Sequence, residues 1–268
     1  MFFQVNGQVV YAYTGNKALN LQQPTVVFIH GAQNDHSVWA LQSRYFAYHG
    51  YNVLAVDLPG HGRSGGMALN TVGQMANWLL ALLDAAKITN ASLIGHSMGS
   101  LIALETAHQA PARIDKLALL GTAYPMKVSD ALLDAAQNEE YNAIDMVNIW
   151  SHVNQLHQPS SLAPGFSVLG VSRRLMQRIS QINPAKVFHT DFLACNTYNN
   201  GETAAHSVAC PTLFLIARKD MMTPPKAAQT LINSVTDKQV EILENCGHSM
   251  MTEQAELVLN KLYRFIRG

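Results

Sequence analysis

Cysteine is scarce in this chain of 268 residues. Its 3 cysteines, Cys195, Cys210 and Cys246, are an odd number, stand far apart and form no C-x-x-C pair. This usage argues against a disulfide framework and against a cysteine-based zinc site. We therefore expect buried thiols in a protein of the reducing cytoplasm.

Charge is also sparse and shows no excess of either sign. Charged residues make up 13% of the chain, and 18 Lys and Arg residues balance 18 Asp and Glu residues. Nucleic-acid binders carry a basic surplus, so we expect a small-molecule partner instead. No apolar run is long enough to span a bilayer, and residues 1–4 lack the basic segment of a signal peptide. The 11 histidines form no H-x-x-x-H pair, so neither a metal nor another cofactor is expected.

Short apolar runs that end in Gly, His, Asp or Pro predict strands buried on both faces of a sheet. Such runs occupy 26–29, 53–56, 92–94, 117–120 and 212–216, with an edge strand expected at 240–243 and a hairpin within 1–13. Helical periodicity lies between them, as at 72–86 and 252–266. The alternation predicts an α/β fold, a three-layer α/β/α sandwich around a mostly parallel, eight-stranded sheet.

The alternation of strand and helix stops after residue 123 and resumes near Cys210-Pro211. Residues 124–206 show helical patterns at 131–152 and 173–182, with a Pro- and Ser-rich loop at 159–165. A chain of this length suits one core with an insertion better than two domains. We therefore expect a core domain of 1–123 and 207–268 and a mainly helical cap inserted at 124–206.

A candidate nucleophile lies in Gly95-His96-Ser97-Met98-Gly99, between the strand 92–94 and a helical stretch at 101–109. This context is the one a nucleophile elbow requires, because the sharp turn leaves no room for side chains two residues before and after the serine. We expect Ser97 to be the nucleophile and His96 to point into the structure. An ordinary Gly-rich turn is the alternative.

A serine hydroxyl needs a base, and the base needs a carboxylate that fixes its tautomer. Asp220 follows the strand 212–216, and His248 follows the strand 240–243. Loops at the carboxyl ends of parallel strands converge, so these residues can meet Ser97 in one crevice. The rival carboxylates Glu244 and Asp237 do not follow a buried strand in this way.

The oxyanion that forms during attack on a carbonyl requires two backbone N–H donors. One is expected from Met98, which follows the nucleophile at the start of a helix. The other is expected from Ala32, in the loop after the strand 26–29. A plain turn at His30-Gly31 is the alternative, but it falls at the crevice end of its strand.

Together these segments resemble the capped α/β-hydrolases, in the branch with a serine nucleophile. The matching segments are His30-Gly31, Asp57-Leu58-Pro59-Gly60-His61-Gly62-Arg63-Ser64, Gly95-His96-Ser97-Met98-Gly99, Asp220 with Thr223-Pro224, and Gly247-His248. The resemblance covers both ends of the chain and fails in the middle. It implies that 57–64 is a structural loop, so Asp57, His61 and Arg63 are not expected to be catalytic.

The combined pattern predicts a serine hydrolase that cleaves an ester-like bond, first of all a carboxylic ester, through an acyl-enzyme. Its substrate is expected to be small and largely apolar, because aromatic residues of the insert would shape the pocket. The expected pocket residues are His30, Gln33, Tyr124, Trp150 and Phe166, with Phe188 and Phe192 as further aromatics of the insert.

Several alternatives stay open on the same residues. Thioester, lactone and carbon–carbon bond hydrolysis use the same machinery, and a small-molecule-binding protein with slow turnover would keep it too. The resemblance excludes dehalogenases and epoxide hydrolases, which have aspartate where Ser97 stands. It disfavours diketone carbon–carbon hydrolases, which tend to have tryptophan where Ser249 stands. The insert could bury its apolar face against the core or against a second copy, so a homodimer also stays open.

Overall fold

A central sheet organises the structure, a computed structural model that describes residues 1–153 and 167–268. The strands are β1 (Phe2–Val5), β2 (Gln8–Tyr13), β3 (Thr25–Ile29), β4 (Asn52–Val56), β5 (Ala91–His96), β6 (Ile114–Leu120), β7 (Thr212–Ala217) and β8 (Lys238–Leu243). They form one 8-stranded sheet in the order β1-β2-β4-β3-β5-β6-β7-β8. The pairs made by β1 and β2 are antiparallel and the others are parallel, as the sequence predicts.

Both faces of the central strands are buried, which explains their unbroken apolar runs. Val27, Leu93 and Phe214 pack into a cluster on one face of the sheet. Their chain neighbours Phe28 and Ile94 pack into a second cluster on the other face. Successive side chains of a strand point to opposite faces, so a strand covered on both faces must be apolar at every position.

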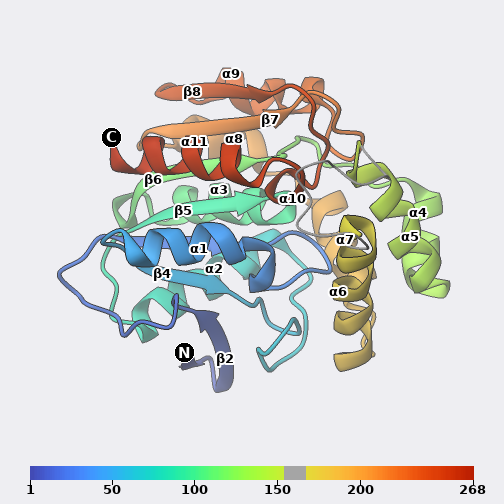
Figure 1. Ribbon diagram of the computed structural model, residues 1–268, viewed down its shortest axis with the longest axis horizontal. Coiled ribbons are helices and arrows are strands. Elements are labelled where there is room, and N and C mark those ends of the chain that lie inside the picture. The colour runs from blue at the N-terminus through green and yellow to red at the C-terminus, as the bar shows by residue number, and fades with distance from the viewer. Residues whose placement is uncertain (154–166) are drawn as a thin grey trace.

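Helices cover the two faces in separate layers (Figure 1). α1 (Ala40–Tyr48) and α11 (Ala255–Arg267) lie on one face, and α2 (Val72–Ala85), α3 (Met98–Gln109), α8 (Gly201–Ser207) and α9 (Gln229–Ser234) lie on the other. The short elements η1 (His36–Trp39), η2 (Pro111–Arg113), η3 (Pro225–Ala228) and α10 (Met250–Glu253) join them. None of the helices in the described residues is long and apolar enough to cross a membrane.

Helices α4 (Asp130–Asn138), α5 (Glu140–Ser151), α6 (Val168–Ile182) and α7 (Val187–Thr197) follow β6 and lie beyond one end of the sheet, at the right of Figure 1. They pack around a cluster of their own that includes Leu132, Ile144, Met176 and Phe188. The helix expected at 131–152 is divided at Glu139 into α4 and α5, and the one at 173–182 begins at Val168. The loop expected at 159–165 lies outside the described residues.

The boundary of the insert differs from the expected one at its C-terminal end. Helix α8 begins within the expected insert 124–206, yet its Ala204 and Ala205 are fully buried in the same cluster as Val27 and Phe214 of the sheet. The chain therefore returns to the sheet layer at Gly201. The small residues of α8 allow this helix to pack closely in that layer.

Candidate active site

Ser97 occupies the tight turn between β5 and α3, with a φ of 53° and a ψ of −121°. A Cβ atom at Gly95 would lie 2.1 Å from the carbonyl oxygen of Gly99, and one at Gly99 would lie 2.3 Å from that of Ile29. Both glycines are therefore required by close backbone approach, as the sequence predicts. The positive φ of Ser97 is a strain of the kind found at functional turns. Its backbone N–H donates to the Leu120 carbonyl at 2.9 Å, which anchors the turn.

Asp220 and His248 follow β7 and β8, and the fold brings their side chains together. The Nδ1 atom of His248 lies 2.8 Å from Oδ2 of Asp220. The other oxygen, Oδ1, accepts the backbone N–H groups of Met222 and Thr223 at 2.9 Å and 2.7 Å. Burial favours the neutral carboxyl, but His248 and these hydrogen bonds outweigh it and lower the pKa of Asp220. The imidazole therefore faces an ionised carboxylate.

The Thr223 hydroxyl and Gly121 complete the surroundings of this pair. Oγ1 of Thr223 lies 2.8 Å from Oδ2 of Asp220, 3.1 Å from Nδ1 of His248 and 3.0 Å from the carbonyl oxygen of Gly121. Gly121 has a φ of 54°, and a Cβ atom there would lie 3.2 Å from Nδ1 of His248. The imidazole is thus held against backbone on one side and a carboxylate on the other.

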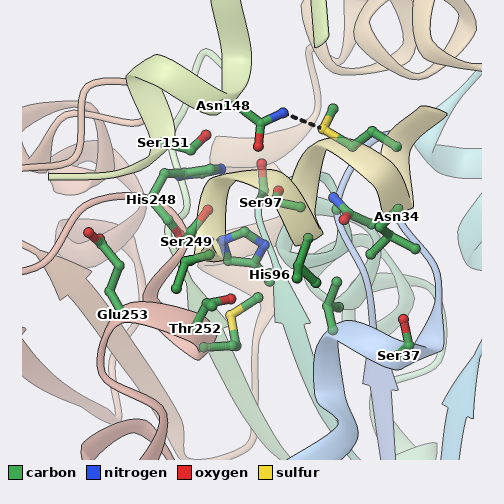
Figure 2. Close-up of a pocket in the computed structure, with 18 of the residues that line it drawn as sticks. Asn34, Ser37, His96, Ser97, Asn148, Ser151, His248, Ser249, Thr252 and Glu253 are labelled. Carbon is green, nitrogen blue, oxygen red and sulfur yellow. Dashed lines mark hydrogen bonds between the residues drawn. The ribbon is translucent and has the colours of Figure 1, made fainter. Parts of the chain in front are cut away.

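Ser97 and His248 line the same cavity (Figure 2). Among the described residues, no hydrogen bond joins the Ser97 hydroxyl to the His248 ring. Catalytic hydrogen bonds of this kind are often long until substrate binds, so this separation is compatible with a nucleophile and its base.

His96 is hydrogen-bonded to the backbone of His248. Nε2 of His96 lies 2.9 Å from the carbonyl oxygen of His248, and since a carbonyl only accepts, that nitrogen carries the proton. Burial, followed by the neighbouring His248, lowers the pKa of His96 to about 3. His96 is therefore a neutral hydrogen-bond donor, which agrees with the structural position expected for it, although its side chain also reaches the cavity wall.

The loop that carries His248 is also fastened to the end of α5. The Ser249 N–H donates to the Ser151 carbonyl at 2.9 Å. The buried carboxylate of Glu253 accepts the N–H of Gly247 at 2.6 Å through Oε2 and that of Val153 at 2.8 Å through Oε1. A Cβ atom at Gly247 would lie 2.8 Å from the Ser151 carbonyl oxygen, so only glycine permits this approach.

The expected oxyanion donors, Ala32 and Met98, follow β3 and Ser97 respectively. Met98 is the first residue of α3, whose free N–H groups and dipole favour negative charge. Ala32 follows β3 and lines the cavity. Within the part of the chain that the structure describes, neither backbone N–H donates a hydrogen bond.

The cavity in front of Ser97 has a volume of about 1250 Å³. Typical small-molecule pockets measure about 300–1,000 Å³, so this cavity is large enough for a small-molecule substrate. Its apolar wall includes Val147, Met176, Phe188, Phe192 and Met222, and its polar wall includes Asn34, Ser37, Arg174, Thr252, Glu253 and Asn260. Phe188 and Phe192 thus lie where the sequence predicts aromatic residues of the insert.

His30 and Gln33 do not line this cavity, and their expected role as pocket residues is wrong. Both are fully buried in the loop after β3. His30 donates from Nδ1 to the Gly31 carbonyl at 2.8 Å and accepts the Leu58 N–H on Nε2 at 3.2 Å. Burial, then the charge of His61, lowers the pKa of His30 to about 4. His30 turns inward because both of its ring nitrogens find buried partners, and Nε2 of Gln33 finds its partners on α6.

The aromatic residues expected in the pocket have other positions. Tyr124 donates its hydroxyl to the Asn199 carbonyl at 2.7 Å and packs against Gly201. Trp150 packs on the cluster between the helices that follow β6. Neither is among the described residues that line the cavity. Phe166 lies outside the described residues.

Asp35, His36 and Asp57 offer ligand atoms within 4.8 Å of one another, the spacing of a metal site. Each is already engaged in hydrogen bonds. Asp35 accepts from Ser37 and pairs with Arg178, and Asp57 accepts the His36 N–H at 2.7 Å and the Arg63 N–H at 2.8 Å. These contacts tie the loop after β4 to η1 and explain the cluster as a structural one.

Comparison with known proteins gives the family. The model of the alpha/beta hydrolase fold family matches residues 24–255. The dihydrolipoyllysine-residue acetyltransferase component of the acetoin cleaving system of Pseudomonas putida is 36% identical over 254 residues, 90% of this chain and 63% of that protein. A 2-hydroxy-6-oxononadienedioate/2-hydroxy-6-oxononatrienedioate hydrolase of Cupriavidus pinatubonensis is 27% identical, over 87% of this chain and 83% of its own.

Two facts qualify these likenesses. The chain spans only 33% to 63% of the length of three curated relatives that it matches at 33% to 38% identity. The solved enol-lactonase of Burkholderia xenovorans LB400 superposes with a TM-score of 0.86 over 100% of both chains at 22% sequence identity, which shows a shared fold. With its sheet, its elbow and the family match over most of its length, the chain belongs to the alpha/beta hydrolase fold family.

Proposed function

We propose that this protein is a serine hydrolase that cleaves an ester-like bond of a small and largely apolar substrate. A carboxylic ester is the first candidate for this bond. The observation that carries this proposal is that His248, held by Asp220 at 2.8 Å, lies in the wall of the same cavity as the strained Ser97. Relatives and structural neighbours named as hydrolases, an esterase and an enol-lactonase support hydrolysis of this general kind.

The proposed reaction has two halves. Ser97 Oγ attacks the carbonyl carbon as Nε2 of His248 takes its proton, and the N–H groups of Ala32 and Met98 receive the oxyanion. The tetrahedral intermediate expels an alcohol, which takes the proton from His248 and leaves an acyl-enzyme. Water then attacks the acyl carbon as His248 takes its proton. The acid leaves as His248 returns that proton to Ser97 Oγ. Asp220 holds the imidazole in the required tautomer and stabilises its positive charge.

The apolar part of the cavity supports an apolar substrate group next to Ser97. Met176 and Phe188 are almost fully buried, and Phe192 lies beside Phe188 with ring centroids 4.3 Å apart. Burying a hydrocarbon group against such side chains contributes about 25 cal/mol per Å² of apolar surface. The polar wall would then face the leaving group or solvent.

A second candidate is acyl transfer from a thioester. The Pseudomonas putida relative is named as an acetyltransferase component, and a Ser97 acyl-enzyme would serve transfer to a thiol as well as hydrolysis. Thioester substrates tested with and without an acceptor thiol would separate the two reactions.

A fluorophosphonate probe with peptide mass analysis tests the nucleophile. We expect one labelled peptide, containing Ser97, in the wild type, no label in Ser97→Ala, and a loss of ester hydrolysis of about 10⁴-fold or more in that variant. Equal labelling of Ser97→Ala would refute the assignment. With p-nitrophenyl esters, one equivalent of product followed by no turnover would favour a binding protein over an esterase.

A further inference from the structure

The loop after β3 presents the expected oxyanion donor Ala32, and its first peptide plane is fixed by His30. Nδ1 of His30 donates to the carbonyl of Gly31 at 2.8 Å. The carbonyl and N–H of one trans peptide point in opposite directions. Holding the Gly31 carbonyl on the His30 side therefore directs the Ala32 N–H away from it.

The next peptide plane, between Ala32 and Gln33, is held at both ends. The Asn34 side chain donates to the Ala32 carbonyl at 2.9 Å. The Gln33 N–H donates to Oδ2 of Asp191, which lies on α7, at 2.9 Å. Gln33 has a φ of 55°, a conformation that side chains other than glycine adopt only where the surroundings impose it. Here the surroundings that impose it include a carboxylate 158 positions along the chain.

Asp191 is itself held in place by His61. Its Oδ2 lies 2.9 Å from Nε2 of His61, whose Nδ1 donates to the Pro59 carbonyl at 3.1 Å. Both ring nitrogens therefore act as donors, as in an imidazolium. Burial disfavours this charge, but the carboxylate of Asp191 and the hydrogen bonds outweigh it and raise the pKa of His61. Both side chains are almost fully buried, so the carboxylate cannot move freely into water.

The side chain of Gln33 is hydrogen-bonded to α6. Its Nε2 donates to Oγ of Ser180 at 2.7 Å and to the Met176 carbonyl at 3.0 Å, and Oε1 of Glu140 lies 3.2 Å away. The helices that follow β6 therefore hold Gln33 by both its backbone and its side chain.

We propose that Asp191 is a positioning residue for the oxyanion hole. By accepting the Gln33 N–H, it keeps the Ala32–Gln33 peptide in one orientation, and with it the backbone N–H of Ala32, a residue that lines the same cavity as Ser97. The helices beyond the sheet thus act on the chemistry, through α7, in addition to shaping the pocket. This inference rests on the proposed function, in which Ala32 donates to the oxyanion.

Two substitutions separate the position of the Asp191 carboxylate from its charge. Asp191→Asn keeps an oxygen beside the Gln33 N–H but removes the charge, whereas Asp191→Glu keeps the charge and displaces the oxygens by a methylene group. If position matters, kcat for a p-nitrophenyl ester stays within about 3-fold of wild type in Asp191→Asn. It falls by about 10- to 100-fold in Asp191→Glu and Asp191→Ala, with KM almost unchanged, since a lost oxyanion donor costs about 10²–10³-fold.

The opposite order overturns the inference. If Asp191 serves only as the structural partner of His61, Asp191→Asn loses thermal stability and activity while Asp191→Glu keeps wild-type kcat. A folded Asp191→Ala with wild-type kcat would overturn it as well. Asp145→Ala, which breaks an exposed ion pair between Asp145 on α5 and Arg173 on α6, is the matched control and should keep wild-type kcat and KM.

The same experiment distinguishes failure of the inference from failure of the proposed function. If wild-type protein neither reacts with fluorophosphonate nor hydrolyses any ester, the proposed function is wrong. If wild-type protein reacts at Ser97 and the Asp191 variants differ from the predicted order, only the role of Asp191 is wrong.

Discussion

At Thr223 a single hydroxyl contacts three groups of the candidate site. Its one proton can go to the Gly121 carbonyl or to Asp220, and its lone pairs face the Nδ1–H of His248. The hydroxyl thus limits the rotation of both members of the pair. The sequence shows Thr223 only as part of the Thr223-Pro224 segment after Asp220, which does not indicate this role.

We predict that Thr223→Val lowers kcat by about 5- to 10-fold with KM within about 2-fold of wild type, because one hydrogen bond contributes about 1 kcal/mol. Steady-state ester hydrolysis measures the effect. Thr122→Val is the matched control: this hydroxyl is buried without a hydrogen-bond partner among the described residues, so its removal should be neutral or slightly stabilising. Equal rates for the two variants would contradict the role of Thr223.

At the scale of elements, α10 connects the end of α5 with the loop that follows β8 and carries His248. Glu253 lies on α10, and its two carboxylate oxygens accept one N–H from each side. The helices beyond the sheet are therefore coupled to His248 as well as to the loop after β3. Movement of α5 would shift the base relative to Ser97, and a shift of about 1 Å is enough to slow a reaction severely.

We predict that Glu253→Gln lowers the free energy of unfolding by about 1–3 kcal/mol and kcat/KM by about 10-fold. The amide NH₂ cannot accept a hydrogen bond, so one buried N–H loses its acceptor. Urea denaturation and ester kinetics measure the two effects. Glu244 lies just after β8 and makes an exposed ion pair with Arg218. Glu244→Gln is the control and should change neither quantity appreciably. Wild-type behaviour of Glu253→Gln would refute the coupling.

At the scale of the whole molecule, buried histidines make stability depend on pH in a defined direction. His30 and His96 have pKa values of about 4 and about 3 in the folded protein, against 6.5 as the ordinary value. Below pH 6.5 the unfolded chain binds protons at these positions that the folded chain does not. The free energy of unfolding therefore decreases as the pH is lowered. The raised pKa of His61 acts in the other direction: its contribution is complete below pH 6.5 and is lost as the pH rises through its folded pKa.

We predict that the free energy of unfolding decreases between pH 6 and pH 4.5, with each of His30 and His96 contributing up to about 1.4 kcal/mol per pH unit. Urea denaturation at a series of pH values measures the slope. His96→Gln should make the slope shallower by one such contribution. His206→Gln, at an exposed position on α8, is the comparison. The same unfolding free energy at pH 7 and pH 5 would contradict the prediction.

Local pattern determined much of this protein. The runs at 26–29 and 212–216, and the helical periods between such runs, predict the order of elements because hydrophobic periodicity depends only on nearby residues. The Gly95–Gly99 motif predicts the elbow for the same reason, since the turn itself excludes side chains. Asp220 and His248 were predicted from their places after strands, because parallel strands bring their carboxyl ends to one edge.

Tertiary structure alone decided which polar groups meet across long stretches of chain. The sequence predicts that His30 and Gln33 face a substrate, but the ring of His30 is bound within its own and the following strand's loops, and Nε2 of Gln33 donates to α6. Asp191 accepts the Gln33 N–H from 158 positions away. Glu253 meets Val153 from 100 positions away. No periodicity links such partners, because burial and hydrogen bonding depend on which surfaces the folded chain brings together. The sequence by itself therefore determined the framework and the candidate triad, and the packing of the helices beyond the sheet decided what holds that site in position.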